Sequence, residues 1–382
     1  MTRPPDFAHV CEAYCRSLHM IEPGGDRDKL IYCRAFRQLI YSSKEFVPEA
    51  AVTRYIEVEL IETPEFPVAG PAPRPATDDR PPRSALVRRI RRHAGDIWLT
   101  LLFWNARRNP RFVRHTKPLW TWGAWTFARI MRENILCNSR RILGDHSSRT
   151  EQDALVRGII GSFYDFVSEV GVSIGQSQAE LFGRIEGVDG DAAYKTARHE
   201  SKGAIILTAH MGSFEVGMAA LLEHEKRIHV LFRRDSCGLF EETRSALRRK
   251  LGVMEQCVDD GLAVWVRLRE ALAADAVVLI QGDRVLPGQK GQALPFFNGH
   301  ILFPTGPVKL AAASGAPIIP IFSVRQPDGR IRLFIEPPIY VADAQHFDEA
   351  LTAIKLVLEK YVRLFPEQWL MIHRAWCEDN LP

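Results

Sequence analysis

The sequence predicts an α/β fold, with a largely parallel mixed sheet covered by helices and a helical region in front of it. Three observations support this prediction. After Gly203, short runs that are apolar throughout alternate with segments of helical periodicity. Strands that are apolar on both faces are typical of parallel sheets that helices cover on both sides. From about Ser84 to Gly175 the apolar residues recur at helical spacing instead, so we expect helices there.

Each element of the α/β part follows from its own pattern. The apolar runs predict strands at 203–210, 227–234, 276–283, 316–324 and 331–339. Helical spacing predicts helices at 153–174, 213–225, 239–251, 261–273, 307–314 and 347–364. The glycines and prolines of 295–307 predict a loop.

A proline-rich linker divides the chain. Residues 62–83 contain seven prolines, and proline at this density favours a semi-rigid, exposed segment. Before it we expect a small helical accessory module at 1–61, with helices near Phe7–Met20 and Asp28–Ser42. After it comes a main domain at 84–382, whose helical part is 84–175 and whose α/β part is 203–382.

The cysteines indicate a reducing compartment. Seven scattered cysteines, an odd number in a long chain, are typical of free cytosolic thiols. Cys11, Cys15 and Cys33, with His9 and His19 nearby, are candidates for a metal site. Cysteines that simply pack are the better interpretation, so we expect no bound metal.

The net charge of +4 conceals a basic, tryptophan-rich segment. Between Arg83 and Lys117 there are ten Lys or Arg and one acid, a local charge of +9 that leaves −5 for the rest. Five of the eight tryptophans lie in or near it: Trp98, Trp104, Trp120, Trp122 and Trp125. Arginine and tryptophan beside short apolar runs favour an anionic membrane surface, here through 83–125. Aromatic core packing with solvated arginines is the alternative; nucleic acid is disfavoured because no nucleic-acid module surrounds the segment.

Two further patterns bear on location. No stretch reaches the roughly 18 consecutive apolar residues that a membrane span needs. The first residues, MTRPPDFAHV, lack the basic and then apolar order of a signal peptide. We therefore expect peripheral attachment to a membrane, without secretion and without a span.

The candidate catalytic residue is His210, where a predicted strand ends and a predicted helix begins. Function gathers at such carboxyl ends of strands in α/β folds. Glu215 lies in the first turn of the expected helix, where its carboxylate is expected to bond one imidazole nitrogen and leave the other as a general base. Gly212 permits close backbone approach. A structural histidine bound to a helix cap would give the same pattern, and Ser213 lacks the Gly-x-Ser-x-Gly context of a nucleophile.

Four motifs carry a resemblance to a known family: LTAHMGSFEVG at 207–217, HVLFRR at 229–234, the block from LIQGDRV to PIIPIF at 279–322, and PEQWLMIHRAW at 366–376. Residues 203–376 resemble the late acyltransferases of lipid A synthesis, the lauroyl/myristoyl transferases of the lysophospholipid acyltransferase superfamily. The resemblance implies that a fatty acyl group moves from an acyl carrier protein (ACP) or coenzyme A (CoA) thioester to a hydroxyl of a lipid A-like or other glycolipid or aminolipid. It makes His210 the base and Glu215 its orienting partner, with no cofactor besides the acyl-ACP or acyl-CoA co-substrate.

The resemblance also implies positions that bind substrate. Arg233 and Arg234 fall where the family places basic residues that can hold a phosphate or a developing oxyanion. Asp283 and Arg284 occupy a box that often reads Asp-Gln in the family. The phenylalanines Phe296, Phe297 and Phe303 are expected to line the acyl channel, although phenylalanines of a plain core would give the same pattern.

Family members commonly begin with a hydrophobic anchor helix, whereas this chain carries the basic segment 83–125. We therefore expect a peripheral enzyme at the cytoplasmic face of the inner membrane. Two alternatives stay open at this point. An acyl thioesterase or lipid hydrolase can use the same His–Glu pair, and a non-catalytic lipid-binding protein can keep the fold.

Overall fold

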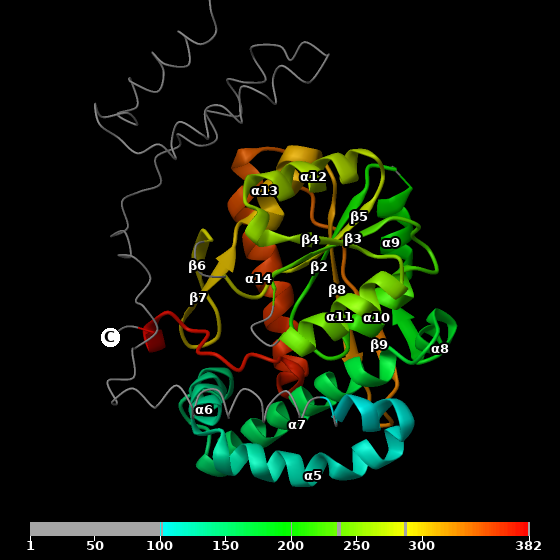
Figure 1. Ribbon diagram of the computed structural model, residues 1–382. Coiled ribbons are helices and arrows are strands. Elements are labelled where there is room, and N and C mark those ends of the chain that lie inside the picture. Colours follow the sequence, from blue (N-terminus) through cyan, green and yellow to red (C-terminus); the bar gives the residue numbers. More distant parts are fainter. Residues whose placement is uncertain (1–99, 101, 200, 235–237, 286–288, 381–382) are drawn as a thin grey trace, which may run out of the picture. The chain divides into compact units, whose positions relative to one another are not determined.

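The computed structural model describes residues 100–380, apart from 101, 200, 235–237 and 286–288. Its main sheet has seven strands in the order β1-β9-β8-β2-β5-β3-β4 (Figure 1). All neighbouring strands are parallel except β8 and β9. The strands are β1 (Ile185–Asp189), β2 (Ala204–Thr208), β3 (Ile228–Phe232), β4 (Met254–Cys257), β5 (Val277–Gln281), β8 (Ile318–Arg325) and β9 (Ile331–Ile335). The predicted fold class, a largely parallel mixed sheet, is confirmed.

Helices cover both faces of this sheet, as the apolar strands require (Figure 1). Along β5, Val278 packs with α12 and α14, whereas the next residue, Leu279, packs with α10 and α11. One face carries α12 (Leu262–Ala273), α13 (Gly306–Ser314) and α14 (Phe347–Leu364). The other carries α8 (Gln178–Phe182), α9 (Asp191–Arg198), α10 (Phe214–Leu221) and α11 (Gly238–Lys250). The helices expected in this part are confirmed, most with ends shifted by only a few residues.

A third group of helices lies at the carboxyl ends of the central strands. It consists of α5 (Pro110–Phe127), α6 (Arg129–Leu143) and α7 (Arg149–Ser173), at the bottom of Figure 1. A capping box between Ser148 and Glu151 starts α7. Phe166 of α7 packs on Phe214, which follows β2, with ring centroids 4.9 Å apart. The helical layer therefore adjoins the edge where functional residues of α/β folds gather.

The structure also departs from the sequence-based expectations. Residues 295–307 do not form a loop: β6 (Gly291–Pro295) and β7 (His300–Pro304) make an antiparallel hairpin. Its turn holds Phe297 at a positive φ of 48°. The short strands β1 and β4 and the helix α9 were not predicted. The expected module 1–61 and linker 62–83 lie outside the described residues.

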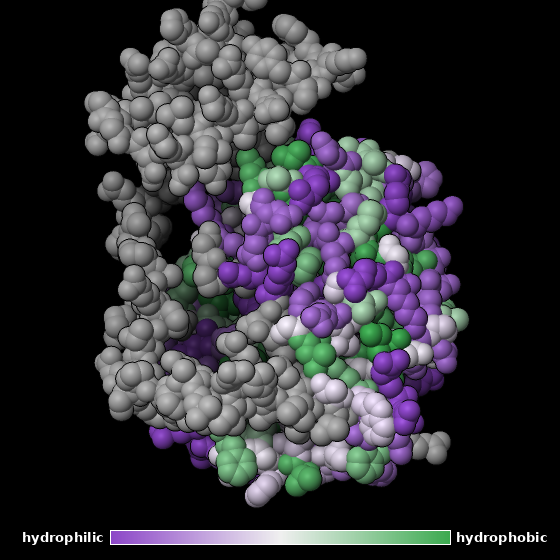
Figure 2. All heavy atoms as spheres, viewed as in Figure 1, coloured by the Kyte–Doolittle hydropathy of each residue, from purple (hydrophilic) through white to green (hydrophobic). Residues whose placement is uncertain are grey.

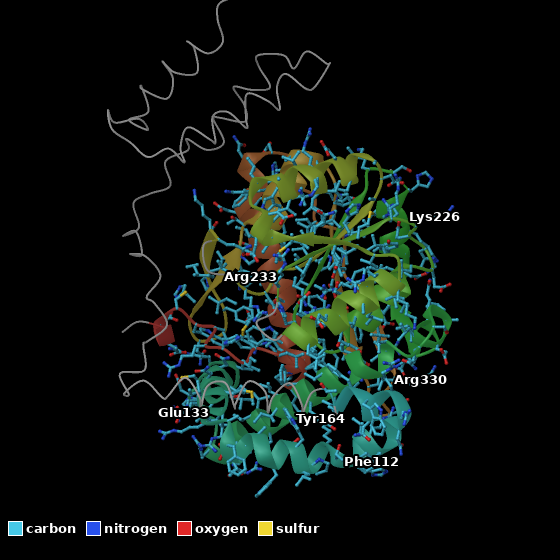
Figure 3. All side chains as sticks on the ribbon, in the orientation of Figure 1. Phe112, Glu133, Tyr164, Lys226, Arg233 and Arg330 are labelled. Carbon is cyan, nitrogen blue, oxygen red and sulfur yellow. The ribbon has the colours of Figure 1, made fainter. Side chains whose placement is uncertain are left out.

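One face of α5 exposes large apolar side chains. Phe112 is 50%, Leu119 68% and Trp122 57% exposed, and Phe127 at the end of the helix is 79% exposed. Figure 2 shows apolar residues along this lower border of the molecule, and Figure 3 marks Phe112 there. None of the described helices is both long enough and apolar enough to cross a bilayer.

The tryptophans of the basic segment divide between two environments. Trp104 and Trp122 are exposed, whereas Trp120 packs on Tyr164 with ring centroids 5.1 Å apart. The ring of Trp125 lies under the Arg157 guanidinium, 3.9 Å from its carbon. Trp98 lies outside the described residues. Part of the segment therefore packs within the domain and part faces outward.

Candidate active site

The pairing register of β2 and β5 brings His210 and Asp283 together. Thr208 at the end of β2 is the partner of Gln281 at the end of β5. His210 and Asp283 each follow two residues later, and the Gly282 N–H still donates to the Thr208 carbonyl at 2.9 Å. Two neighbouring parallel strands therefore deliver an imidazole and a carboxylate to the same point.

Asp283 holds His210 through two atoms. The His210 backbone N–H donates to Asp283 Oδ2 at 3.0 Å, and His210 Nδ1 lies 2.7 Å from Asp283 Oδ1. On the other side of the ring, Arg284 Nη2 lies 2.9 Å from His210 Nε2. A carboxylate only accepts and a guanidinium only donates hydrogen bonds. The contacts therefore fix the tautomer: Nδ1 carries the proton, and Nε2 carries the lone pair.

The charges of the site follow from burial and neighbours. Burial lowers the pKa of His210 and the Arg284 and Arg244 charges lower it further, against the opposing effect of Asp283. Burial disfavours ionised Asp283, but its interactions with His210, the Arg284 charge and a hydrogen bond from Trp369 together lower its pKa to about 2. At neutral pH the pair is therefore a carboxylate and a neutral imidazole, the form in which a histidine can act as a base.

The expected hydrogen bond between Glu215 and His210 is wrong. Both imidazole nitrogens have other partners, and Glu215 Oε1 instead accepts from Arg244 Nε at 2.7 Å. Glu215 is buried in the first turn of α10, and Arg244 belongs to α11. The carboxylate therefore ties two helices together behind the site, while Asp283 takes the position expected for Glu215.

Known proteins provide an independent comparison. The sequence profile of the bacterial lipid A biosynthesis acyltransferase family matches residues 83–378. The chain belongs to this family. Membership implies an acyltransferase with a lipid acceptor and an acyl thioester donor. No curated protein matched the sequence.

The C-terminal segment of this acyltransferase supports the His210–Asp283 pair. Trp369, buried, donates its Nε1–H to Asp283 Oδ2 at 3.0 Å. The His210 carbonyl accepts from the Leu370 N–H at 2.7 Å, and the Gln368 carbonyl accepts from the Gly212 N–H at 3.0 Å. Gly212 has a φ of +57°, and a Cβ there would lie 2.1 Å from the Ser323 carbonyl oxygen. Gly212 is thus required for packing, and its N–H already has a partner.

A buried carboxylate supports the same loop from the helical layer. Glu169 of α7 accepts hydrogen bonds from the Ser213 hydroxyl and from Arg184 and Arg325. Burial opposes the ionisation of Glu169, but Arg325 and Arg184 outweigh it and lower its pKa. Ser213 is therefore an anchor for the start of α10. The sequence pattern did not identify Glu169, which is 44 residues upstream of Ser213 in the chain.

The remaining predicted residues divide into two groups. Arg233 and Arg234 follow β3, the strand next to β5, so they lie at the same edge as His210; Figure 3 marks Arg233. Arg233 Nε lies 3.4 Å from Asp259 Oδ1.

The predicted phenylalanines pack in the core. Phe296, fully buried, packs between Trp369 and Trp376, with centroids 5.8 and 6.0 Å away, and Phe297 packs against it. These rings fill the core beneath the site.

An apolar hollow lies beside the carboxyl ends of β2 and β5, where sequence reasoning did not place it. Its lining comes from these strands, β8 and α14: Leu207, Thr208, Gly282, Pro320, Phe322, Ile354, Val357 and Leu358.

In the described part of the chain, no group of His, Cys, Asp and Glu residues is arranged to hold a metal ion.

Proposed function

We propose that the chain transfers a fatty acyl group from an acyl-ACP or acyl-CoA thioester to a hydroxyl of a lipid A-like or other glycolipid or aminolipid. His210 is the general base and Asp283 its positioning residue. The observation that carries this proposal is the tautomer of His210, which leaves Nε2 as the basic nitrogen. Family membership supplies the class of reaction.

The reaction proceeds by direct transfer. As the hydroxyl oxygen attacks the thioester carbonyl carbon, Nε2 takes the hydroxyl proton. The new C–O bond forms, the C–S bond breaks, and the leaving thiolate takes the proton back from Nε2. Asp283 stays ionised throughout and stabilises the imidazolium that forms in between. No covalent acyl-enzyme is needed, because the thioester is already activated.

Positive charge at the mouth of the site suits anionic substrates. Arg233 and Arg234 are both exposed, and they follow β3, the neighbour of the strand that leads to Asp283. Arginine binds phosphate through paired N–H donors and stabilises a developing oxyanion. We assign these two residues to the phosphate of either substrate or to the oxyanion.

The exposed face of α5 fits the surface of an anionic membrane. Its large apolar side chains, Phe112, Leu119 and Trp122, are accompanied by exposed cations, among them Arg107, Arg108, Arg114 and Arg129. Apolar side chains enter the headgroup region while arginines pair with lipid phosphates. The layer of α5–α7 also lies at the carboxyl edge, so docking this face brings His210 toward a lipid acceptor. We infer peripheral attachment at the cytoplasmic face of the inner membrane.

The catalytic proposal is tested by product analysis. The full chain is incubated with acyl thioesters and a lipid extract, and acylated lipid is identified by mass spectrometry. His210→Gln should lose at least about 100-fold in rate, because general-base catalysis contributes roughly 10²–10⁴. The matched control is His300→Gln, which replaces an exposed histidine bound to Glu378 and should keep full activity. An active His210→Gln enzyme contradicts the proposal, and free fatty acid formed equally without lipid would indicate a hydrolase.

The membrane proposal is tested by flotation on phosphatidylglycerol-containing vesicles. The double substitution Leu119→Asp and Trp122→Asp should reduce bound protein by about tenfold or more, because it places two charges in the apolar face. The control is Leu356→Asp on α14, a leucine that is 56% exposed on another surface. Equal flotation of the double variant and the wild type contradicts this assignment of the membrane surface.

A further inference from the structure

The catalytic nitrogen of His210 is already occupied. Arg284 Nη2 lies 2.9 Å from Nε2, the atom that must receive the proton of the acceptor hydroxyl. Because a guanidinium can only donate, this hydrogen bond uses the lone pair of Nε2. The base of the proposed reaction is therefore capped in this structure, and Arg284 must move before His210 can act.

The Arg284 side chain, which caps His210 Nε2, lacks a hydrogen-bond acceptor for one of its donors in the described part of the chain. Arg284 is half-buried, and its Nε has no hydrogen-bond partner among the described residues. The carboxylate of the preceding residue, Asp283, already accepts from His210 through both oxygens and from Trp369. A buried donor without a partner costs stability until a partner arrives. The guanidinium is thus a charged group with donors to spare next to the reacting nitrogen.

We propose that an anionic group of the substrate, a phosphate, draws Arg284 away from Nε2 and so releases the base. The inference rests on the proposed function, because it assigns a control step to the same site. A phosphate offers several acceptor oxygens and forms paired, charge-assisted bonds with arginine, which a neutral imidazole cannot match. Arg233 and Arg234, which follow the neighbouring strand β3, make the same edge attractive to such an anion.

The cap gives the enzyme a way to discriminate. Without a phosphate at the edge, Nε2 stays bound to Arg284, and water that reaches the thioester is not activated. With a phosphate in place, the lone pair of Nε2 is free for the acceptor hydroxyl. Arg284 therefore differs from an arginine that only binds substrate, because its removal should accelerate the reaction of substrates that lack phosphate.

The kinetic test varies phosphate on each substrate separately. The donor arm compares acyl-phosphopantetheine with acyl-pantetheine, and the acceptor arm compares a lipid extract with the same extract treated with phosphatase. In the wild type, one of the two pairs should show a difference: whichever substrate carries the phosphate that moves Arg284 should react at least about tenfold faster with its phosphate than without it. Arg284→Gln should reduce this ratio toward one by raising the phosphate-free rate severalfold. A variant that slows both members equally, or leaves the phosphate-free rate unchanged, overturns the proposal.

A second measurement does not depend on turnover. Diethylpyrocarbonate modifies a neutral imidazole at a free nitrogen, so its rate at His210, followed by peptide mass spectrometry, reports the cap. Arg284→Gln, and inorganic phosphate added to the wild type, should each raise this rate severalfold. Arg267→Gln, which removes one exposed arginine paired with Asp260, should not change it.

The two measurements separate the two levels of the account. Labelling that responds to phosphate in a protein without any transfer activity would sustain the cap and contradict the proposed function. Transfer activity, together with a labelling rate that neither phosphate nor Arg284→Gln changes, would contradict the cap and sustain the proposed function.

Discussion

The carboxyl edge of the sheet and the outer face of α5 are built on opposite principles. At the edge, each oxygen of Asp283 has a donor from His210 or Trp369, and all of these groups are buried or half-buried. On α5, Leu119 and Trp122 expose more than half of their surface. Asp283 finds all of these donors within the chain, whereas the α5 face is the kind of apolar surface that an external partner covers. In the proposed function, the first region supplies the chemistry and the second brings the enzyme to its lipid substrate.

The largest effect should come from the buried support of the edge. Glu169→Ala leaves Arg184 and Arg325 partly buried side by side without their carboxylate, so the free energy of unfolding should fall by about 3–5 kcal/mol. Urea unfolding measures this. The control is Glu133→Ala. Glu133, which is marked in Figure 3, forms an exposed ion pair with Arg129, so its loss should leave the unfolding midpoint unchanged. Equal effects of the two substitutions would remove the distinction between buried and exposed ion pairs.

The α5 face should respond to salt where the edge does not. Raising the ionic strength several-fold screens exposed arginines from lipid phosphates, so vesicle binding should weaken by roughly tenfold. The rate at saturating concentrations of a soluble acyl thioester and a soluble acceptor should change little, because saturation offsets weaker substrate binding and the short His210–Asp283 contact is largely shielded from solvent. Vesicle binding that is insensitive to salt would leave only the apolar side chains as the cause of docking.

Loss of the indole N–H of Trp369 should have a smaller effect, on kcat. Trp369→Phe keeps the packing but removes the N–H that binds Asp283 Oδ2, so kcat should fall about five- to tenfold with KM unchanged. The control is Trp376→Phe, which removes an N–H bonded to the Phe296 carbonyl instead. A loss of thermal stability without a loss of kcat in Trp369→Phe would make Trp369 a packing residue only.

The pH dependence should show the smallest effect. Because the pKa of His210 is lowered from 6.5, the neutral base persists below that value, and the acid limb of the rate profile should lie below pH 6.5. Besides burial, the groups that set the pKa of His210 are Asp283, Arg284 and Arg244. Arg284→Gln removes one lowering charge and should move the limb toward higher pH. An acid limb above 6.5 in the wild type contradicts a base in this environment.

Much of the fold could be predicted because burial dictates its pattern. The predicted strands β2, β3, β5, β8 and β9 are mostly apolar along their whole length, and α14 has the ends that its helical spacing predicts. β4, with the sequence MEQC, is a polar edge strand, so it carries no apolar run. The β6–β7 hairpin was missed because its glycines and prolines resemble those of a loop.

The sequence places His210 at the carboxyl end of a strand, as the structure does, but it favours the wrong partner for the imidazole. His210 and Asp283 each follow an apolar strand by two residues, which is visible in the sequence, but their contact depends on β2 and β5 being neighbours in register. Strand order is a long-range property that apolar patterning does not encode. Glu215 was favoured because it is close in sequence, whereas the structure directs its carboxylate to Arg244 on α11.

The central claim is that Asp283, and not Glu215, sets the protonation state of His210, the proposed base. The most direct test measures kcat for acyl transfer and the thermal midpoint of Asp283→Asn and Glu215→Gln together. We expect Asp283→Asn to lose about 10²-fold or more in kcat, because an amide no longer fixes the tautomer or stabilises the imidazolium. Glu215→Gln should lose thermal stability with less than about a threefold change in kcat, because it weakens the contacts to Arg244 and Arg248 and none to His210. An inactive Glu215→Gln beside an active Asp283→Asn would contradict the account.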